Sequence, residues 1–195
     1  MDNSKVKQFF DFKSAHWDER PTRPSEVYDD FAKEYFRINK GDKVLDLGCG
    51  SGTFIPAIYK LNHASVTGMD ISDKMIDLAK PKFAGNDDVT LMAGDFYDSD
   101  IKGFDVIVCH NAISHFLDSK ELSKKCAAAL NPGGRLVITH FVNFEEINKR
   151  HSHANPMVAR ILESAPIEAK YFEDEFDIHM TMDDPYYIIS LTKKN

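Results

Sequence analysis

From residue 41 onward, short apolar runs rich in β-branched residues alternate with stretches in which apolar residues recur at helical spacing. The short runs predict strands over 43–47, 65–69, 89–92, 104–109 and 135–141. Helices are predicted between them over 54–61, behind a cap at Ser72 or Asp73, and over 119–130. This β-α order predicts an α/β fold, a doubly wound and mostly parallel sheet with right-handed crossovers.

The chain departs from this alternation before residue 41. The spacing of Val27, Phe31, Tyr35 and Ile38 predicts a helix, and a break with two prolines over 21–24 precedes it. The segment before the break carries the aromatic residues Phe9, Phe10, Phe12 and Trp17. It could fold over a ligand cleft as a lid, or it could only pack on the sheet.

The chain also departs from the alternation after the fifth predicted strand. Residues 143–153 are polar and predict a loop or a short helix, and a second short helix is predicted near 157–163. Two late strands, over about 169–179 and 186–192, predict an antiparallel hairpin.

Between the first strand and its helix, residues 46–52 read Asp-Leu-Gly-Cys-Gly-Ser-Gly. A strand that ends in glycines and opens into a helix is a nucleotide-binding arrangement. Glycine lets the backbone turn tightly and lets a ligand approach without a Cβ in the way. The loop alone does not separate one nucleotide ligand from another.

Acidic residues narrow the choice of ligand. Asp46 precedes the loop, Asp70 ends the second strand, and Asp95 follows the third. An NAD site would share the glycines and Asp70, but its loop would read GxGxxG, and a carboxylate at Asp46 would repel a pyrophosphate. Three acids around one cleft favour a cationic adenosyl ligand.

Several motifs resemble those of the class I (Rossmann-like) S-adenosylmethionine-dependent methyltransferases. The segments that resemble the family's motifs, in the family's order, are 44–53, 68–72, 94–96, 104–108 and 130–136. The resemblance implies S-adenosyl-L-methionine as cofactor and a seven-stranded sheet whose last strand is antiparallel. The cofactor-binding residues that it suggests are Asp46, Gly48, Cys49, Gly50, Asp70, Ile71, Met75, Asp95, Phe96 and Asn111.

With this resemblance, the chain divides into three parts of a single domain over 1–195. Residues 1–40 are expected to form a helical lid, 41–141 the cofactor-binding core, and 142–195 a substrate-side segment with the terminal strand hairpin.

Methyl transfer is a direct displacement, so much of the catalysis can come from holding the nucleophile in line with the methyl group. A general base helps when the nucleophile carries a proton to lose. The candidates are His115, in a stretch after the fourth strand that resembles the methyl-donor border of small methyltransferases, and then His140, which ends the fifth. His151 and His153 do not suggest a metal site, because residues two apart point to opposite faces of a strand and meet poorly on a helix.

Composition limits the partners. The net charge is −7, so nucleic acid is not expected, and no apolar run is long enough for a membrane helix. Three cysteines without a disulfide pattern are typical of a cytoplasmic protein. The short insertion beyond the fifth strand favours a small-molecule methyl acceptor over a macromolecule. The chain is expected to be a monomer or a homodimer.

Two other functions stay open at this point. One is an NAD(P)-dependent oxidoreductase, which the loop spacing and Asp46 disfavour. The other is a non-catalytic S-adenosylmethionine-binding protein, because the cofactor motifs are complete whereas the catalytic ones are weak.

Overall fold

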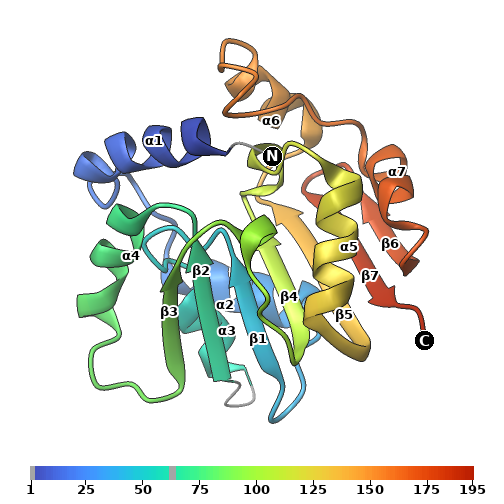
Figure 1. Cartoon of the computed structure of the whole chain (residues 1–195), viewed down its shortest axis with the longest axis horizontal. Helices are drawn as coiled ribbons and strands as arrows, with labels where there is room; N and C mark the ends of the chain where they lie inside the picture. Colours follow the sequence, from blue (N-terminus) through green and yellow to red (C-terminus); the bar gives the residue numbers. More distant parts are fainter. Residues whose placement is uncertain (1–2, 62–64) are drawn as a thin grey trace.

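The computed structural model describes residues 3–61 and 65–195. Within these ranges seven strands form one sheet in the order β3-β2-β1-β4-β5-β7-β6 (Figure 1). The strands are β1 (Lys43–Leu47), β2 (Ser65–Asp70), β3 (Val89–Ala93), β4 (Phe104–His110), β5 (Leu130–His140), β6 (Phe176–Met182) and β7 (Tyr187–Lys193). β1 to β5 are parallel, and β7 runs antiparallel to both β5 and β6. The predicted fold class is confirmed.

The register places the glycine loop at the centre of the carboxyl edge. Asp46 of β1 pairs with Gly68 of β2 on one side and with Val108 of β4 on the other. The chain moves outward from β1 to β3 and then returns to β4, so β1 and β4 flank the point where the strand order reverses. Ligands bind at such points in open α/β sheets, outside the carboxyl ends of the strands.

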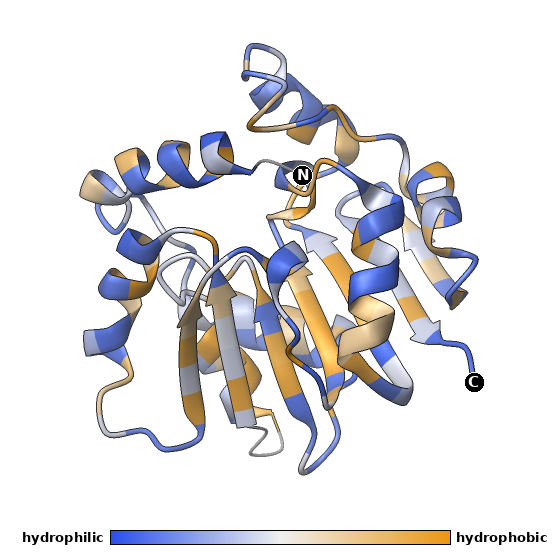
Figure 2. Ribbon diagram, in the orientation of Figure 1, coloured by the Kyte–Doolittle hydropathy of each residue, from blue (hydrophilic) through white to orange (hydrophobic). Residues whose placement is uncertain are grey.

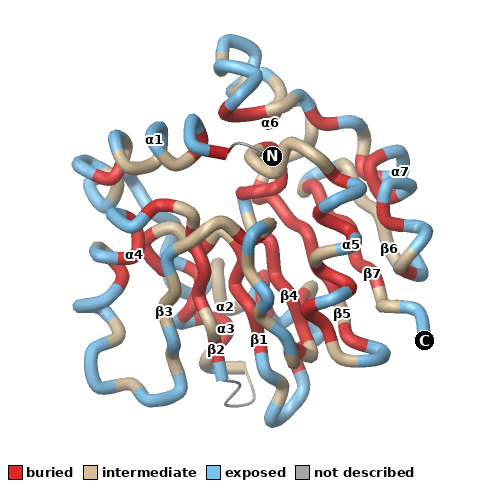
Figure 3. The backbone as a smooth tube through the Cα atoms, in the orientation of Figure 1, coloured by how far each residue is buried: buried red, intermediate tan, exposed pale blue. Residues whose placement is uncertain are grey.

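Helices cover both faces of the sheet. They are α1 (Ser4–Lys13), α2 (Ser25–Tyr35), α3 (Ile55–Lys60), α4 (Asp73–Ala79), α5 (Ser119–Ala129), α6 (Phe144–His151) and α7 (Ala165–Glu168). On one face α2, α3 and α4 bury Phe31, Ile58 and Ile76 against the strands. On the other face α5 buries Leu122 and Cys126. Because both faces are covered, the central strands are apolar and buried (Figures 2 and 3).

The residues before β1 form two different structures. α2 packs against α3 as part of the core, with Phe31 and Ala32 buried. α1 instead lies across the carboxyl edge of the sheet, near α4 (Figure 1). Within the described part of the segment expected to form a lid, 1–40, α1 and the turn after it lie over the carboxyl edge, whereas α2 belongs to the face of the sheet. That α1 acts as a lid stays a prediction.

The structure corrects three element predictions after residue 130. No helix forms over 157–163, because the side chain of Asn148 holds Leu162 through its N–H and C=O groups; a short helix follows instead as α7. The strand predicted over 169–179 begins only at Phe176, since Ala169–Phe172 is a 3-10 helix packed on α5. β5 starts at Leu130, and the Pro-Gly-Gly break is an irregularity inside that strand.

The described helices include none that is both long and apolar enough to cross a membrane.

Candidate active site

A cavity of about 270 Å³ opens at the carboxyl edge of the sheet. Its floor comes from the glycine loop, the end of β2, and the turns after β3 and β4. Its cover comes from the N-terminal segment 3–22, called the strap below, which contains α1 and the 3-10 turn Ser14–His16. Phe10, Trp17 and Arg20 of the strap line the cavity.

Ten of the twelve residues predicted for the site line this cavity: Asp46, Gly48, Cys49, Gly50, Asp70, Ile71, Asp95, Phe96, Asn111 and His115. Met75 and His140 do not line it. Met75 is buried in α4, where its N–H donates to the Ser72 Oγ that caps the helix. His140 is buried at the end of β5 opposite Tyr187 of β7.

The glycine loop has a backbone that other residues rarely adopt. Gly48, Gly50 and Gly52 have φ angles of +75°, +54° and +81°. A Cβ on Gly48 would lie 2.7 Å from the Cβ of Ala112, so the loop packs tightly against the turn after β4. The N–H groups of Gly48 and Cys49 both donate to the Met69 carbonyl, at 2.8 and 3.1 Å. The loop is therefore held to β2, and its glycines leave the cavity open.

Asp70 and Asp95 are fixed by hydrogen bonds around the cavity. Each Asp70 oxygen accepts one backbone N–H, from Gly50 at 2.8 Å and from Ser72 at 2.9 Å. Burial raises the pKa of Asp70, and these two hydrogen bonds oppose the shift. Asp95 accepts from the Tyr97 N–H at 3.0 Å and from the Asn3 amide at 2.7 Å, so the strap reaches this carboxylate directly.

Asp46 is a buried carboxyl that forms no ion pair with any residue in the described ranges. Its side chain is 2 % exposed, and its Oδ2 has no hydrogen-bond partner in the part of the chain that the structure describes. Burial, with a smaller contribution from Asp70, raises its pKa to about 7. A cationic group in the cavity would favour the ionised form of Asp46.

His115 lies in the 3-10 turn Ile113–His115 after β4. Its Nδ1 is 2.9 Å from the Val158 carbonyl oxygen, and because a carbonyl can only accept, Nδ1 carries the proton. The lone pair is then on Nε2, which makes no hydrogen bond to any described residue. Burial lowers the pKa of His115 to about 4, so the ring is neutral at physiological pH. A neutral imidazole with a free Nε2 can accept a proton.

Two residues of the site, His110 and Asn3, are not among those predicted from the sequence. His110 lines the cavity, stands 2.8 Å from the Thr139 hydroxyl and packs against Phe54 and Phe141. Burial lowers its pKa to about 3. Its position at the end of β4 was the available signal. The strap residue Asn3 had no comparable signal, since its partner Asp95 is 92 positions away.

Three further contacts close the strap onto the core. Asp11 accepts from the Ser72 hydroxyl at 2.6 Å. Asp18 accepts from the Ser51 hydroxyl at 2.6 Å and pairs with Lys82 at 2.8 Å. Trp17 lies over Gly50, and the Arg20 guanidinium stacks on the indole at 4.0 Å. Residues along the strap, from Asn3 to Asp18, thus contact the residues that surround the cavity.

The family match begins after the strap and α2 and includes the whole sheet-forming part of the chain up to β7. The sequence profile of the methyltransferase domain family matches residues 38–189. The chain belongs to this methyltransferase family. Its fold and its solved neighbours are those of the class I S-adenosylmethionine-dependent methyltransferases, which confirms the resemblance found in the sequence.

Individual relatives support the same assignment. The chain is 30% identical over 143 residues to the ubiquinone biosynthesis O-methyltransferase of Coxiella burnetii, a match that covers 70% of this chain and 61% of the relative. The chain thus spans about three fifths of the length of that curated relative. It superposes with a TM-score of 0.79 and 18% identity on a chain from the complex between the Haloferax volcanii Trm112 methyltransferase activator and a methyltransferase, covering 95% and 98% of the two chains.

A further solved structure contains the demethylated donor. It is the magnesium protoporphyrin IX methyltransferase of Synechocystis with bound S-adenosylhomocysteine, at a TM-score of 0.68, 20% identity and full coverage of both chains. Methyltransferases of the family to which the chain belongs use S-adenosylmethionine as the methyl donor. The comparisons give no support to the oxidoreductase alternative.

Proposed function

We propose that this chain transfers the methyl group of S-adenosylmethionine to a small-molecule acceptor. One observation carries the proposal: a neutral imidazole with a free Nε2, that of His115, lines the same cavity as the glycine loop and its acids. The family supplies the donor, and this histidine is the group that could act on an acceptor.

The residues around the cavity fit S-adenosylmethionine. The glycine loop forms a cradle that a Cβ at Gly48 would disturb. Each Asp70 oxygen has accepted one hydrogen bond, so the carboxylate can still accept from ribose hydroxyls. Asp95 can accept from the adenine amino group, and Asp46 can attract the ammonium group. Met75 is buried in α4 and does not line the cavity.

Bound S-adenosylmethionine would supply a methyl group on a positively charged sulfur; the nucleophile would bond to the methyl carbon as the carbon–sulfur bond breaks, with S-adenosylhomocysteine as the leaving group. The cavity walls must hold the acceptor in line with that methyl group and exclude water. His115 Nε2 accepts a hydrogen bond from the acceptor's O–H or N–H and takes its proton as the new bond forms. His140 has no access to the cavity, so the proposal assigns the proton transfer to His115.

The size of the cavity supports a small acceptor. Its volume of about 270 Å³ lies just below the 300–1,000 Å³ that ligand pockets span in general. The Coxiella burnetii relative is an O-methyltransferase of ubiquinone biosynthesis, and the Synechocystis neighbour is a magnesium protoporphyrin IX methyltransferase. Both names indicate small molecules rather than nucleic acids.

The cellular setting belongs to the same proposal. Cys49, Cys109 and Cys126 are all buried and free, as suits a reducing cytoplasm. A monomer or a homodimer stays the prediction for its assembly.

Replacing His115 with alanine tests the proposal. We expect His115→Ala to lower kcat roughly 100-fold or more, which is the usual contribution of a general base. Affinity for S-adenosylhomocysteine should stay within about twofold, because His115 acts on the acceptor. Calorimetry measures binding, and release of S-adenosylhomocysteine over a panel of phenols, carboxylic acids and amines measures transfer.

The pH dependence gives a second readout. Since the pKa of His115 is about 4, the ring is neutral and able to accept a proton above that pH. The kcat of the unchanged chain should therefore fall only below about pH 5, where His115 becomes protonated, and His115→Ala should lack this fall. His153→Ala, at an exposed histidine, is the matched control and should leave kcat unchanged. Unchanged turnover in His115→Ala contradicts the catalytic role, and binding without transfer to any acceptor favours the non-catalytic alternative.

A further inference from the structure

The turn that carries His115 is held by a segment far along the chain. Residues 155–164 pass over the turn after β4 without forming a helix or strand. Val158 accepts the His115 ring N–H through its carbonyl at 2.9 Å. The Arg160 N–H donates to the Ser114 carbonyl, also at 2.9 Å. Two residues of this segment therefore fix both the ring of His115 and the backbone beside it.

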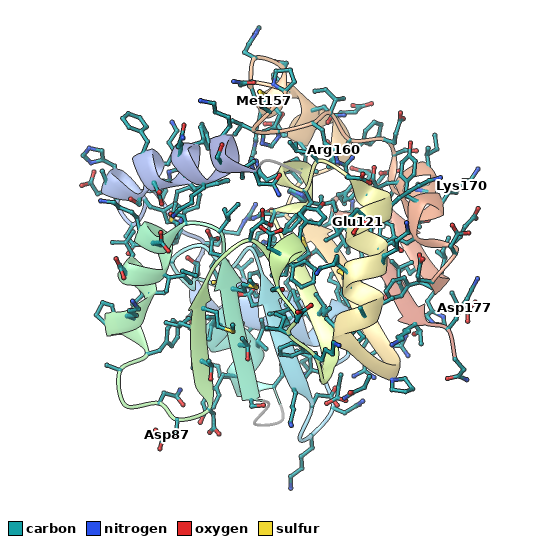
Figure 4. The ribbon with its side chains drawn as sticks, viewed as in Figure 1. Asp87, Glu121, Met157, Arg160, Lys170 and Asp177 are labelled. Atoms are coloured by element: carbon teal, nitrogen blue, oxygen red, sulfur yellow. The ribbon has the colours of Figure 1, made fainter. Side chains whose placement is uncertain are left out.

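The Arg160 side chain completes the contact on the other side of His115. Its Nε donates to the Phe116 carbonyl at 2.9 Å. The residues before and after His115 are thus both bonded to Arg160, one through its backbone and one through its guanidinium. Figure 4 shows Arg160 between the top of α5 and the segment that follows α6.

A buried carboxylate fixes the guanidinium itself. Glu168 of α7 is 0 % exposed, and its two oxygens accept from the two terminal nitrogens of Arg160. Ser119, at the start of α5, donates to Glu168 at 2.6 Å and accepts from Arg160 at 2.7 Å. Such a bidentate pair has a fixed geometry, so the guanidinium plane cannot turn without breaking several hydrogen bonds.

We infer that Arg160, held by Glu168 and Ser119, is a positioning residue that fixes the orientation and tautomer of His115. The inference rests on the proposed function of His115 as the proton acceptor. Without the guanidinium, the Phe116 carbonyl loses its donor, and the 155–164 segment loses its anchor on α5 and α7. The Val158 carbonyl then no longer holds the His115 ring N–H, and the proton can move to Nε2, the atom that must accept.

Arg160→Lys is the main test variant, because it keeps a positive charge beside Glu168. A lysine cannot donate at once to Phe116, to Ser119 and to both Glu168 oxygens in the plane of a guanidinium. In the purified chain with S-adenosylhomocysteine bound, nitrogen NMR of the histidine side chains should show His115 with its proton on Nδ1. In Arg160→Lys the same signals should change to a mixture of the two tautomers.

Kinetics give the second readout. We expect kcat to fall about tenfold or more in Arg160→Lys, since small displacements of a catalytic group have large effects on rate. The Kd for S-adenosylhomocysteine should stay within twofold. The double variant Arg160→Met/Glu168→Gln, which leaves no unpaired charge buried, should fold and show the same loss of tautomer order.

Arg135 and Asp42 provide a matched control at the opposite edge of the sheet. Their side chains are 20% and 13% exposed, close to the 18% of Arg160. Asp42→Asn should lower thermal stability without altering the His115 signals or kcat.

An unchanged His115 tautomer in both Arg160 variants would overturn the inference. The NMR readout does not depend on catalysis. Full turnover in His115→Ala would contradict the role of His115 as the base. If Arg160→Lys then still gave a mixture of the two tautomers, Arg160 would remain the residue that positions His115.

Discussion

At the scale of single residues, Asp46 is a cavity carboxyl whose Oδ2 has no hydrogen-bond partner among the described residues. Its carboxyl is buried beside Asp70, and its pKa is about 7 instead of the usual range near 4. Because the folded pKa is above the unfolded one, Asp46 costs the free chain stability as pH rises from about 4 to 7. A bound ammonium group removes this cost by pairing with the ionised carboxylate.

This balance predicts a pH-dependent affinity. With a pKa of about 7, most Asp46 carboxyls are ionised at pH 8 and most are protonated at pH 6. Affinity for S-adenosylhomocysteine should therefore fall up to about tenfold between pH 8 and pH 6. Asp46→Asn should bind more weakly at pH 8 and show little slope, as measured by calorimetry.

Adenosine is the control ligand for this prediction, because it lacks the ammonium group. Its affinity for the unchanged chain should vary little over the same pH range. Equal slopes for adenosine and S-adenosylhomocysteine would show that another group causes the dependence.

The sequence locates residues such as Asp46 well but says less about the histidines. Asp46, Asp70 and Asp95 each lie within two residues of a strand's carboxyl end, and the carboxyl ends of parallel strands meet at one edge. His140 also ends a strand, yet pairing with Tyr187 of β7 buries it away from the cavity. That pairing joins distant segments, and no local pattern indicates it.

At the scale of elements, the strap is attached mainly through side chains. Asp11 and Asp18 bond to the hydroxyls of Ser72 and Ser51, and the Asp11 and Asp18 side chains are 26% and 42% exposed. Partly exposed contacts of this kind contribute little to global stability. Segments held in this way open at a low free-energy cost, so we expect the strap to open for ligand entry and release while the sheet stays folded.

The double variant Asp11→Ala/Asp18→Ala should open the strap. If the closed form becomes a tenth of the population, the apparent Kd for S-adenosylhomocysteine rises about tenfold. The melting temperature should change little, because the contacts lie outside the core. Calorimetry measures the Kd, and hydrogen exchange of residues 4–17 measures the opening.

Asp29→Ala is the matched control, since it breaks a similar ion pair between α2 and α3, Asp29 with Lys60 at 2.7 Å. It should leave both the Kd and the strap's exchange unchanged. Faster exchange in the Asp11/Asp18 variant with an unaltered Kd would mean that the strap does not contribute to binding.

Elements were predicted best where their pattern is local. β1 matches its predicted bounds because a buried parallel strand reads as an apolar run between turns. The helix predicted over 157–163 does not form, because the Asn148 side chain and the Ser114 carbonyl, both outside the segment, satisfy backbone groups of Leu162 and Arg160. Side-chain bonds of this kind are invisible to helical periodicity.

At the scale of the whole molecule, the site is assembled from both ends of the chain around a central sheet. The strap covers the cavity from the N-terminal side, with Asn3 on Asp95. The 155–164 segment orients His115 from the C-terminal side, through Val158. A ligand in the cavity contacts the sheet edge and the strap together, so binding should stabilise the fold as a unit.

This coupling predicts a thermal shift. A ligand that binds only the folded chain at 100 times its Kd stabilises by about 2.7 kcal/mol. For a domain of this length, each kcal/mol raises Tm by roughly 2–4 °C, so S-adenosylhomocysteine should raise Tm by about 5–10 °C. NAD at the same concentration should produce no shift, which also tests the oxidoreductase alternative at the level of binding.

The Asp11→Ala/Asp18→Ala chain tests how much the strap contributes to this thermal shift. At the same S-adenosylhomocysteine concentration, a tenfold weaker Kd reduces the stabilisation by about 1.4 kcal/mol, because each factor of ten in affinity has that value. The Asp11→Ala/Asp18→Ala chain should therefore show a shift smaller by roughly 3–6 °C. An equal shift in both chains would mean that the ligand binds the sheet edge alone, and the strap would then be a cover that contributes nothing to holding the methyl donor.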